Sequence, residues 1–252
     1  MEIIAHRGAS HDAPENTLAA IHLAWQQRAD AVEVDVHLSK DGHVVVIHDD
    51  NTRKTAGVRK KVRDQTLAQL KTLDAGRWMD RRWAGEKIPT LAEVLATVPD
   101  GKRLFVEIKC GPEVITAFAE TLRQSGRKPS QVVPIGFSLP TMRLLKEELP
   151  ALEVCLVAAF TRRLPRRWRP TAEELIRQAK DARLDGLDLG ARGPLNAAFA
   201  EKIKAAGLKL YVWTVDSPAK AKQLAAAGVD GLTTNRPGPM REALHRFNAS
   251  PL

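Results

Sequence analysis

Eight short apolar runs, separated by segments with helical spacing, constrain the fold of this chain more than any other feature. They occupy residues 3–7, 31–38, 104–109, 132–137, 153–160, 186–190, 208–215 and 231–234. Such runs are typical of buried parallel strands, which need a crossover helix between them. Eight of them in 252 residues predict a closed (β/α)₈ barrel of the TIM type, in the α/β class. A doubly wound open sheet is the alternative, but no G-x-G-x-x-G motif follows the first run.

The segments between these runs have the signals expected of helices. Apolar residues recur at helical intervals, Thr90 is placed to cap a helix, and Gly126, Gly207 and Gly228 are placed to end helices. We therefore expect helices over residues 16–28, 91–98, 112–125, 138–149, 171–184, 195–206 and 217–227.

The alternation is interrupted after the second strand. Residues 39–90 contain a hairpin signal, a basic loop, a short helical stretch at 65–73 and two tryptophans, Trp78 and Trp83. No repeat or linker divides the chain elsewhere. We expect one barrel domain over residues 1–252, with a small inserted subdomain at about 50–90.

Composition bounds the class of protein. The net charge is +9, with basic clusters at 53–63 and 161–169. These clusters could attract an anionic partner, but a solvated surface is the simpler interpretation. Aromatic side chains are few near them, which argues against binding of single-stranded nucleic acid. There is no apolar run near 18 residues, so stable membrane insertion is not expected.

The first residues and the two cysteines bear on the compartment. The first residues lead straight into a strand without a signal-peptide pattern, and Cys110 and Cys155 fit reduced thiols within strands. We expect a cytoplasmic protein, and the sequence leaves open whether it forms a homodimer.

The second strand carries charge where a buried strand normally has none. In VEVDVHL, Val32, Val34 and Val36 alternate with Glu33 and Asp35. In a barrel, the apolar face of this strand would contact the outer helices and the acidic face would point inward. Catalytic groups of such barrels lie at the C-terminal ends of the strands, which is where these carboxylates occur.

Two other segments add charged groups to the same end of the barrel. The third strand, LFVEIK, places Glu107 and Lys109 on one face, and the first strand ends with His6 and Arg7. Trp213 lies near the end of the seventh strand.

A hairpin delivers a second histidine. Asp41-Gly42 is a strong signal for a two-residue loop, which would pair Lys40 with His43 and place His48 opposite Asp35. Cross-strand partners project from the same face, so the imidazole would join the carboxylates.

Together these side chains indicate a metal and an anion site. Glu33, Asp35 and Glu107 cannot all stay ionised without a counter-charge, and oxygen ligands favour one divalent cation, Mg²⁺ or Ca²⁺. Arg7 and Lys109 beside it suit a phosphate. Two histidines can serve as acid and base near neutral pH. Each group alone is more often structural, but three buried strand ends carrying unpaired charge would be costly.

The sequence resembles the glycerophosphodiester phosphodiesterase family over essentially its whole length. The resemblance rests on HRGASHDAPENT, VEVDVHLSKDG, VVVIHDD, LAQLKTLDAGRWMDRRWAGEKIPTLAEVL, FVEIK, VWTVD and GVDGLTTNRP. It implies a (β/α)₈ barrel with a small insertion, and a metal held at the positions of Glu33, Asp35 and Glu107.

The same resemblance implies residue roles. His6 and His48 would be the acid/base pair, Arg7 and Lys109 would contact the phosphate, and Trp213 would lie near the substrate. Glu15 would support His6 or the metal ligands, while Asn16, with Thr17, either supports the site or caps the next helix. The basic segment after His48 departs from the family pattern, and His11 is an extra histidine interpreted as a loop residue.

The function that the resemblance implies is metal-dependent hydrolysis of a small-molecule glycerophosphodiester to sn-glycerol 3-phosphate and an alcohol. The alternatives are lysophospholipase D-type hydrolysis of lysophospholipids, a phosphoinositide lyase-type reaction and, from a different class, a non-catalytic module that binds phosphate esters. The sequence decides neither the head-group alcohol nor which histidine is the acid.

Overall fold

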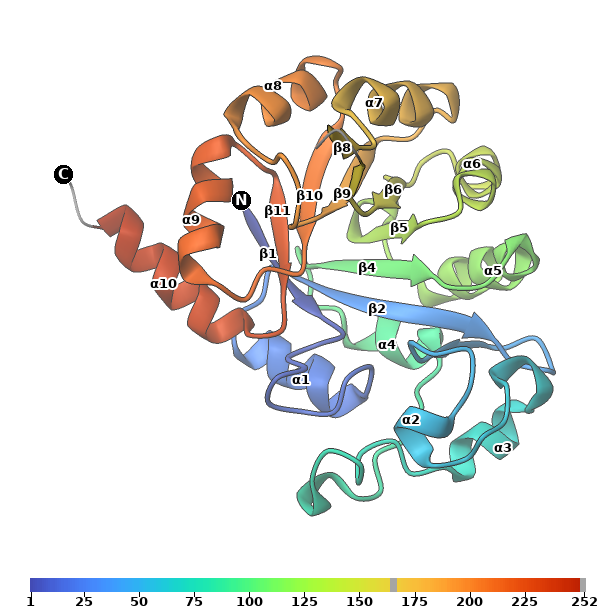
Figure 1. Cartoon of the computed structure of the whole chain (residues 1–252). Helices are drawn as coiled ribbons and strands as arrows, with labels where there is room; N and C mark the ends of the chain where they lie inside the picture. The colour runs from blue at the N-terminus through green and yellow to red at the C-terminus, as the bar shows by residue number, and fades with distance from the viewer. Residues whose placement is uncertain (164–166, 250–252) are drawn as a thin grey trace.

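The eight predicted strands form one closed parallel barrel in the computed structural model, which describes residues 1–163 and 167–249 (Figure 1). The strands are β1 (Glu2–His6), β2 (Ala31–Leu38), β4 (Arg103–Ile108), β5 (Val132–Gly136), β6 (Cys155–Ala158), β9 (Gly186–Gly190), β10 (Lys209–Trp213) and β11 (Gly231–Thr234). They pair in chain order, and β11 closes the barrel by pairing with β1. The (β/α)₈ prediction is therefore confirmed.

Helices follow the strands on the outside of the barrel (Figure 1). They are α1 (Leu18–Gln26), α4 (Leu91–Thr97), α5 (Ile115–Ser125), α6 (Leu139–Glu148), α7 (Ala172–Asp181), α8 (Ala197–Ala205), α9 (Pro218–Ala227) and α10 (Pro237–Ala249). Thr90 caps α4 in a reciprocal capping box with Glu93, and Gly126 and Gly228 end their helices with left-handed φ angles of 65° and 86°. The last helix, α10, was not predicted.

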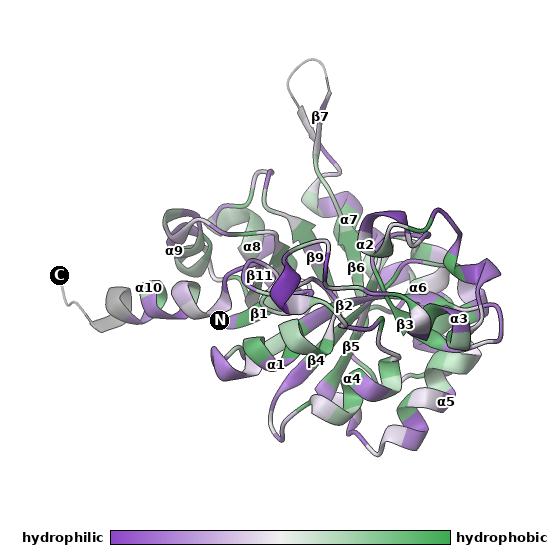
Figure 2. Ribbon diagram, turned by 90° about the horizontal axis from the view of Figure 1, so that it is seen from below, coloured by the Kyte–Doolittle hydropathy of each residue, from purple (hydrophilic) through white to green (hydrophobic). Residues whose placement is uncertain are grey.

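The barrel wall separates two apolar layers. Val32, Val34 and Val36 belong to the large core between the sheet and the helices, as predicted. A smaller cluster fills the barrel interior and includes Ile4, Phe105, Ile135, Val157 and Tyr211. Figure 2 shows apolar residues concentrated in the strands, with hydrophilic residues on the outer surfaces of the helices and in the loops.

The segment between β2 and α4 contains several short elements. These are β3 (Val44–Val46), α2 (Arg53–Ala56), the 3₁₀ turn η1 (Val62–Asp64), α3 (Leu67–Thr72) and the 3₁₀ turn η2 (Arg81–Trp83). Their apolar side chains form a separate cluster of Val45, Ile47, Val62, Leu70, Ala75 and Ile88. α2 and α3 lie beside the barrel in Figure 1. The expected helix at 65–73 corresponds to α3.

The predicted register of the β2–β3 hairpin is wrong by one residue. Val36 pairs with Val46 and Leu38 with Val44, so the loop is longer than the two residues expected. Asp41 explains the difference, because its carboxylate accepts hydrogen bonds from Ser39 Oγ at 2.7 Å and from the Leu67 backbone N–H at 2.9 Å. The loop is thus shaped by its contact with α3. The Ile47 backbone N–H donates to the Asp35 backbone oxygen at 2.9 Å, so His48 is not the cross-strand partner of Asp35.

Three further features complete the fold. The 3₁₀ turns η3 (Pro112–Val114) and η4 (Pro129–Gln131) precede α5 and β5, and the second basic cluster contains the hairpin strands β7 (Thr161–Arg163) and β8 (Arg167–Arg169). Both cysteines are free. Among the described residues, no helix is long and apolar enough to cross a bilayer.

Candidate active site

A cavity of about 310 Å³ opens among the C-terminal ends of the strands. The ends of parallel strands meet at one rim of a barrel, so residues far apart in sequence are brought together there. Seven predicted site residues line the cavity: His6, Arg7, Glu33, His48, Glu107, Lys109 and Trp213.

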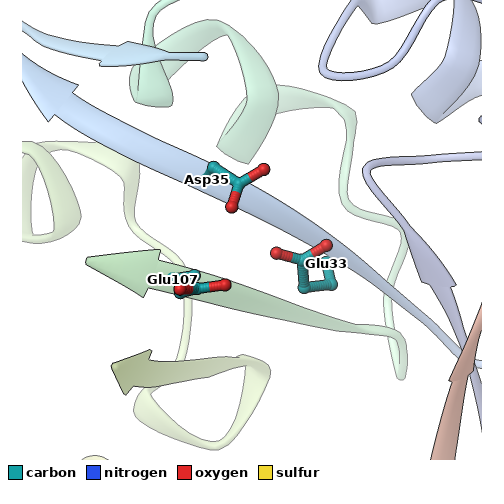
Figure 3. Close-up of side chains that lie close together, drawn as sticks. All are labelled: Glu33, Asp35 and Glu107. Atoms are coloured by element: carbon teal, nitrogen blue, oxygen red, sulfur yellow. The ribbon is translucent and has the colours of Figure 1, made fainter. Parts of the chain in front are cut away.

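Three carboxylates converge beside this cavity. Glu33, Asp35 and Glu107 each present an oxygen, and these oxygens all lie within 4.8 Å of one another. The sheet register produces the cluster, because Asp35 on β2 is the partner of Glu107 on β4 and Glu33 precedes Asp35 by two residues on the same face (Figure 3).

The electrostatics of the cluster show that it lacks positive charge. Burial, together with the neighbouring carboxylates, raises the pKa of Glu33 well above its usual value, and burial and Asp35 raise the pKa of Glu107. Burial alone would also raise the pKa of Asp35, but Arg7, His48 and Lys109 outweigh it and lower that pKa. These three side chains therefore favour the ionised form of Asp35 but do not do the same for Glu33 and Glu107.

The donor set fits a divalent cation. Glu33 Oε1 and Asp35 Oδ1 are buried oxygens without a hydrogen-bond partner in the described structure. Buried carboxylate oxygens normally have partners, and hard cations such as Mg²⁺ and Ca²⁺ take oxygen ligands. The triad could therefore hold a metal ion.

Arg7 and Lys109 border the acidic cluster. Arg7 has a left-handed φ of 57°, and its backbone N–H donates to Glu33 Oε2 at 2.9 Å while its Nε lies 3.0 Å from Asp35 Oδ2. Lys109 Nζ lies 2.9 Å from Glu107 Oε1 and 3.6 Å from Asp35 Oδ1. Both cations are thus fixed at the cavity wall, where an anionic ligand would meet them.

His6 has a defined tautomer. Its Nδ1 lies 2.7 Å from Asn235 Oδ1, and the Asn235 amide is oriented by donating from Nδ2 to Asp216 at 2.6 Å. Because an amide oxygen only accepts, Nδ1 carries the proton and Nε2 is left as an acceptor. Burial and the charge of Arg7 lower the pKa of His6, which favours the neutral ring.

His48 reaches the site from the segment that follows β3. Its Nδ1 lies 2.7 Å from Asp49 Oδ1, and Lys109 Nζ lies 3.2 Å from its Nε2. The backbone oxygen of His48 also lies 3.1 Å from His37 Nε2 at the end of β2. The histidine is therefore brought to the carboxylates as predicted, but by the chain that leaves the strand and not by cross-strand pairing.

The two expected roles of the Asn16–Thr17 pair fall on different residues. Asn16 Nδ2 donates to Asp35 Oδ2 at 2.8 Å, and Asn16 Oδ1 accepts from the Asp35 backbone N–H at 3.1 Å. Thr17 caps α1 by accepting from the Ala20 N–H. Glu15 contacts neither His6 nor the triad directly; it pairs with Arg7 at 3.2 Å and with Lys54 at 2.8 Å.

The opposite side of the cavity is aromatic. Trp213 donates from Nε1 to the Asp188 backbone oxygen at 3.1 Å and packs edge-to-face on Phe137, with ring centroids 5.8 Å apart. Phe137 is 51% exposed at the cavity. His11 is exposed and does not line the cavity, consistent with a loop residue.

Sequence reasoning missed four residues of this region: Asp49, Phe137, Asp188 and Asn235. Asp188 is buried on β9, lines the cavity and has an Oδ1 atom without a partner; burial raises its pKa well above the usual value. Its strand, GLDLG, shows the same inward-facing acidic residue as β2, and that alternation was an available signal. No sequence pattern around Asn235 marks it as a site residue, because its role depends on its contact with His6, where the last strand closes the barrel against the first.

Comparison with known proteins agrees with this geometry. The model of the glycerophosphoryl diester phosphodiesterase family matches residues 6–239. The glycerophosphodiester phosphodiesterase of Caldanaerobacter subterraneus subsp. tengcongensis is 34% identical over 240 residues, covering 93% of this chain and 94% of the relative. That of Bacillus subtilis (strain 168) is 32% identical over 257 residues, covering 93% and 83%.

A solved structure shows the same fold. An Oleispira antarctica phosphodiesterase, in complex with the product sn-glycerol-3-phosphate, superimposes with a TM-score of 0.88 and 29% identity over 97% of each chain. The barrel fold, the family match and the relatives agree with the three carboxylates at the ends of the strands. This chain therefore belongs to the glycerophosphoryl diester phosphodiesterase family and is a phosphoric diester hydrolase.

Proposed function

We propose that the enzyme hydrolyses glycerophosphodiesters to sn-glycerol 3-phosphate and an alcohol, with one Mg²⁺ or Ca²⁺ ion held by Glu33, Asp35 and Glu107. The observation that carries the proposal is the convergence of three carboxylates, two buried and one half-buried, with oxygens within 4.8 Å of one another and bordered by Arg7 and Lys109. The product bound to the Oleispira antarctica relative supports the choice of substrate.

Arg7 and Lys109 would bind the phosphodiester. Arg7 is held by Asp35 and Glu15, so its guanidinium is positioned before the substrate arrives. The bound cation would neutralise negative charge that develops on the non-bridging oxygens. Trp213 would form the apolar wall against the carbon skeleton of the substrate.

His6 and His48 would transfer the protons. The neutral ring of His6, with Nδ1 bonded to Asn235 and Nε2 available, suits the base that deprotonates the nucleophile. His48 would be the other member of the pair and protonate the leaving alkoxide, with its ring oriented by the Asp49 carboxylate 2.7 Å from Nδ1. Either water or the adjacent glycerol hydroxyl, through a cyclic phosphate, could be the nucleophile.

Proton transfer alone cannot supply the catalysis. General acid or base catalysis contributes about 10²–10⁴-fold per group. Most of the remaining acceleration would come from positioning the diester and from stabilising its developing charge with groups that are already oriented. The fixed geometry of Arg7 and of the triad fits that requirement.

The test is removal of each imidazole. We expect His6→Ala and His48→Ala each to lower kcat on glycerophosphocholine by about 100-fold or more, while calorimetry still detects binding of Mg²⁺ or Ca²⁺. His11→Ala is the matched control, because this histidine lies outside the cavity and should retain full activity. Near-normal turnover in either site variant would remove that histidine from the mechanism.

A second candidate activity is lysophospholipase D-type hydrolysis. It is favoured by one observation, the exposure of large apolar side chains: Phe137 at the cavity is 51% exposed and Trp78 in the insertion is 43% exposed. These could contact an acyl chain. A comparison of kcat/KM for glycerophosphocholine and lysophosphatidylcholine, each with metal and with EDTA, separates the two activities.

A further inference from the structure

A second, basic pocket adjoins the active-site cavity. It has a volume of about 470 Å³ and is lined in part by Lys40, Lys61, Arg63 and Lys109. Lys109 lines both spaces, so its side chain stands between the predicted phosphate site and the basic pocket. The other cations come from the β2–β3 loop and from the segment around η1.

Three of these cations have no partner. The side chains of Lys40, Lys61 and Arg63 are exposed and make no hydrogen bond or ion pair with any residue in the described part of the chain. This differs from Lys54 and Lys109, whose ammonium groups lie 2.8 Å from Glu15 and 2.9 Å from Glu107. Cations grouped without counter-charges create a positive potential that favours an anionic ligand.

The acidic residues of the pocket do not neutralise this charge. Asp50 accepts a hydrogen bond from Asn51 Nδ2 at 2.8 Å, and Glu113 accepts from the Gly111 backbone N–H at 3.1 Å. Neither carboxylate forms an ion pair with the three cations. Positive groups therefore outnumber negative groups on the pocket wall.

The backbone that carries the cations is held in place by a buried amide. Gln65 is 3% exposed; its backbone oxygen accepts from the Lys40 N–H at 2.9 Å, and its Nε2 donates to the Lys61 backbone oxygen at 3.3 Å. Asp50 is tied to the same segment by the Val62 N–H at 2.8 Å. The backbone that carries the cations is thus ordered before a ligand binds, so that binding has to order only their side chains.

We propose that the basic pocket binds a second anionic group on the alcohol half of the substrate, so that the preferred substrates are glycerophosphodiesters of a phosphorylated polyol. The inference rests on the proposed function, because it assumes that the diester phosphate lies against Arg7 and Lys109. A phosphate group matches the pocket better than one carboxylate does, since it offers more acceptor oxygens and more charge to several separate cations.

Two substrates that differ by one phosphate test the proposal: glycerophosphoinositol and glycerophosphoinositol 4-phosphate. We expect the native enzyme to favour the phosphorylated ester by about tenfold in kcat/KM, mainly through a lower KM. In Lys61→Gln/Arg63→Gln this preference should fall to about twofold or less. The matched control is Arg177→Gln/Lys180→Gln, which removes the same charge from α7 on the outside of the barrel and should keep the preference.

The outcomes are distinguishable. Equal kcat/KM for the two esters, or a preference that survives in Lys61→Gln/Arg63→Gln, would overturn the pocket assignment while leaving the proposed hydrolysis intact. Loss of the preference in the α7 control as well would show a general effect of net charge and would also overturn it. Failure to hydrolyse either ester, in an enzyme loaded with metal, would reject the proposed function and the inference together.

Discussion

Asp188 illustrates, at the scale of one residue, how a site conflicts with stability. It is 2% exposed, its Oδ1 has no partner, and burial raises its pKa well above the usual value. A buried polar group without a partner costs about 1–3 kcal/mol. Leucine has the same branched arrangement of heavy atoms but no polar atom. We expect Asp188→Leu to raise the free energy of unfolding by about 1–3 kcal/mol in urea denaturation, while kcat/KM falls.

The control for this change is Asp188→Asn, which keeps a buried polar group and should not stabilise the protein. A leucine variant that is less stable than the native protein would mean that the carboxyl group is satisfied in solution. Full activity of that variant would mean that Asp188, although it lines the cavity, does not contact the substrate.

Asn16 positions Asp35, one of the three carboxylates that we propose as metal ligands. Its side chain makes two hydrogen bonds to that residue, at 2.8 Å and 3.1 Å, and its φ angle is 59°. Glycine tolerates this angle, so Asn16→Gly removes the hydrogen bonds without backbone strain. Loss of a residue that orients a metal ligand costs about 10–100-fold in metal affinity. We expect the dissociation constant for Mg²⁺ or Ca²⁺, measured by calorimetry, to rise by that factor.

The matched control for Asn16→Gly is Thr17→Ser, which keeps the hydroxyl that caps α1. That variant should bind metal normally. If Asn16→Gly also left the dissociation constant unchanged, Asp35 would not need this orientation or would not be a ligand.

At the scale of elements, the hairpin between β2 and β3 marks the limit of sequence-based prediction. The apolar strands were predictable because composition and alternation are local properties, and the acidic triad followed from strand ends meeting at one rim. The loop register was wrong because Asp41 bonds to Leu67, a contact between segments that no local signal contains. Asn235 was missed for the same reason, since its partner His6 is 229 residues away.

Asp74 fixes a loop of the inserted segment. Its carboxylate accepts from the backbone N–H groups of Arg77 at 2.9 Å, Gly76 at 3.0 Å and Gly85 at 2.9 Å, and these hydrogen bonds lower its pKa to about 2. A lowered pKa means that the contribution to stability is present above the usual value of 3.8 and is lost as pH falls towards 2. We expect the protection of the Gly85 amide, measured as its exchange rate relative to the intrinsic rate at the same pH, to fall in Asp74→Ala at neutral pH and in the native protein only in that acid range.

The comparison for this loop is Asp64→Ala in the same segment, whose carboxylate makes no hydrogen bond in the described structure. Its Gly85 amide should exchange as slowly as in the native protein. Equal protection of Gly85 in Asp74→Ala would show that the loop is held by other contacts.

At the scale of the whole molecule, folding must place three carboxylates together at the mouth of the barrel, in a chain whose net charge is +9. The positive surface does not neutralise them, because the pKa values of Glu33 and Glu107 stay raised. A divalent ion that binds only the folded chain would stabilise it by about 2.7 kcal/mol at 100 times its dissociation constant. Metal binding and protonation should therefore compete for the same oxygens.

This competition predicts how stability depends on pH. Because the folded-state pKa of Glu33 lies above the usual glutamate value of 4.5, its contribution to stability is complete below about pH 4.5 and is lost as pH rises through the folded value. In EDTA, Glu33→Gln should therefore become more stable relative to the native enzyme as pH rises above 4.5. Excess Mg²⁺ or Ca²⁺ should reverse the order, because only the native enzyme has the full set of ligands. Thermal unfolding of both proteins across this pH range measures their difference in stability, to which the histidines contribute nothing because both proteins have them. If this difference depended on pH in the same way with and without metal, Glu33 would not be a ligand of the ion.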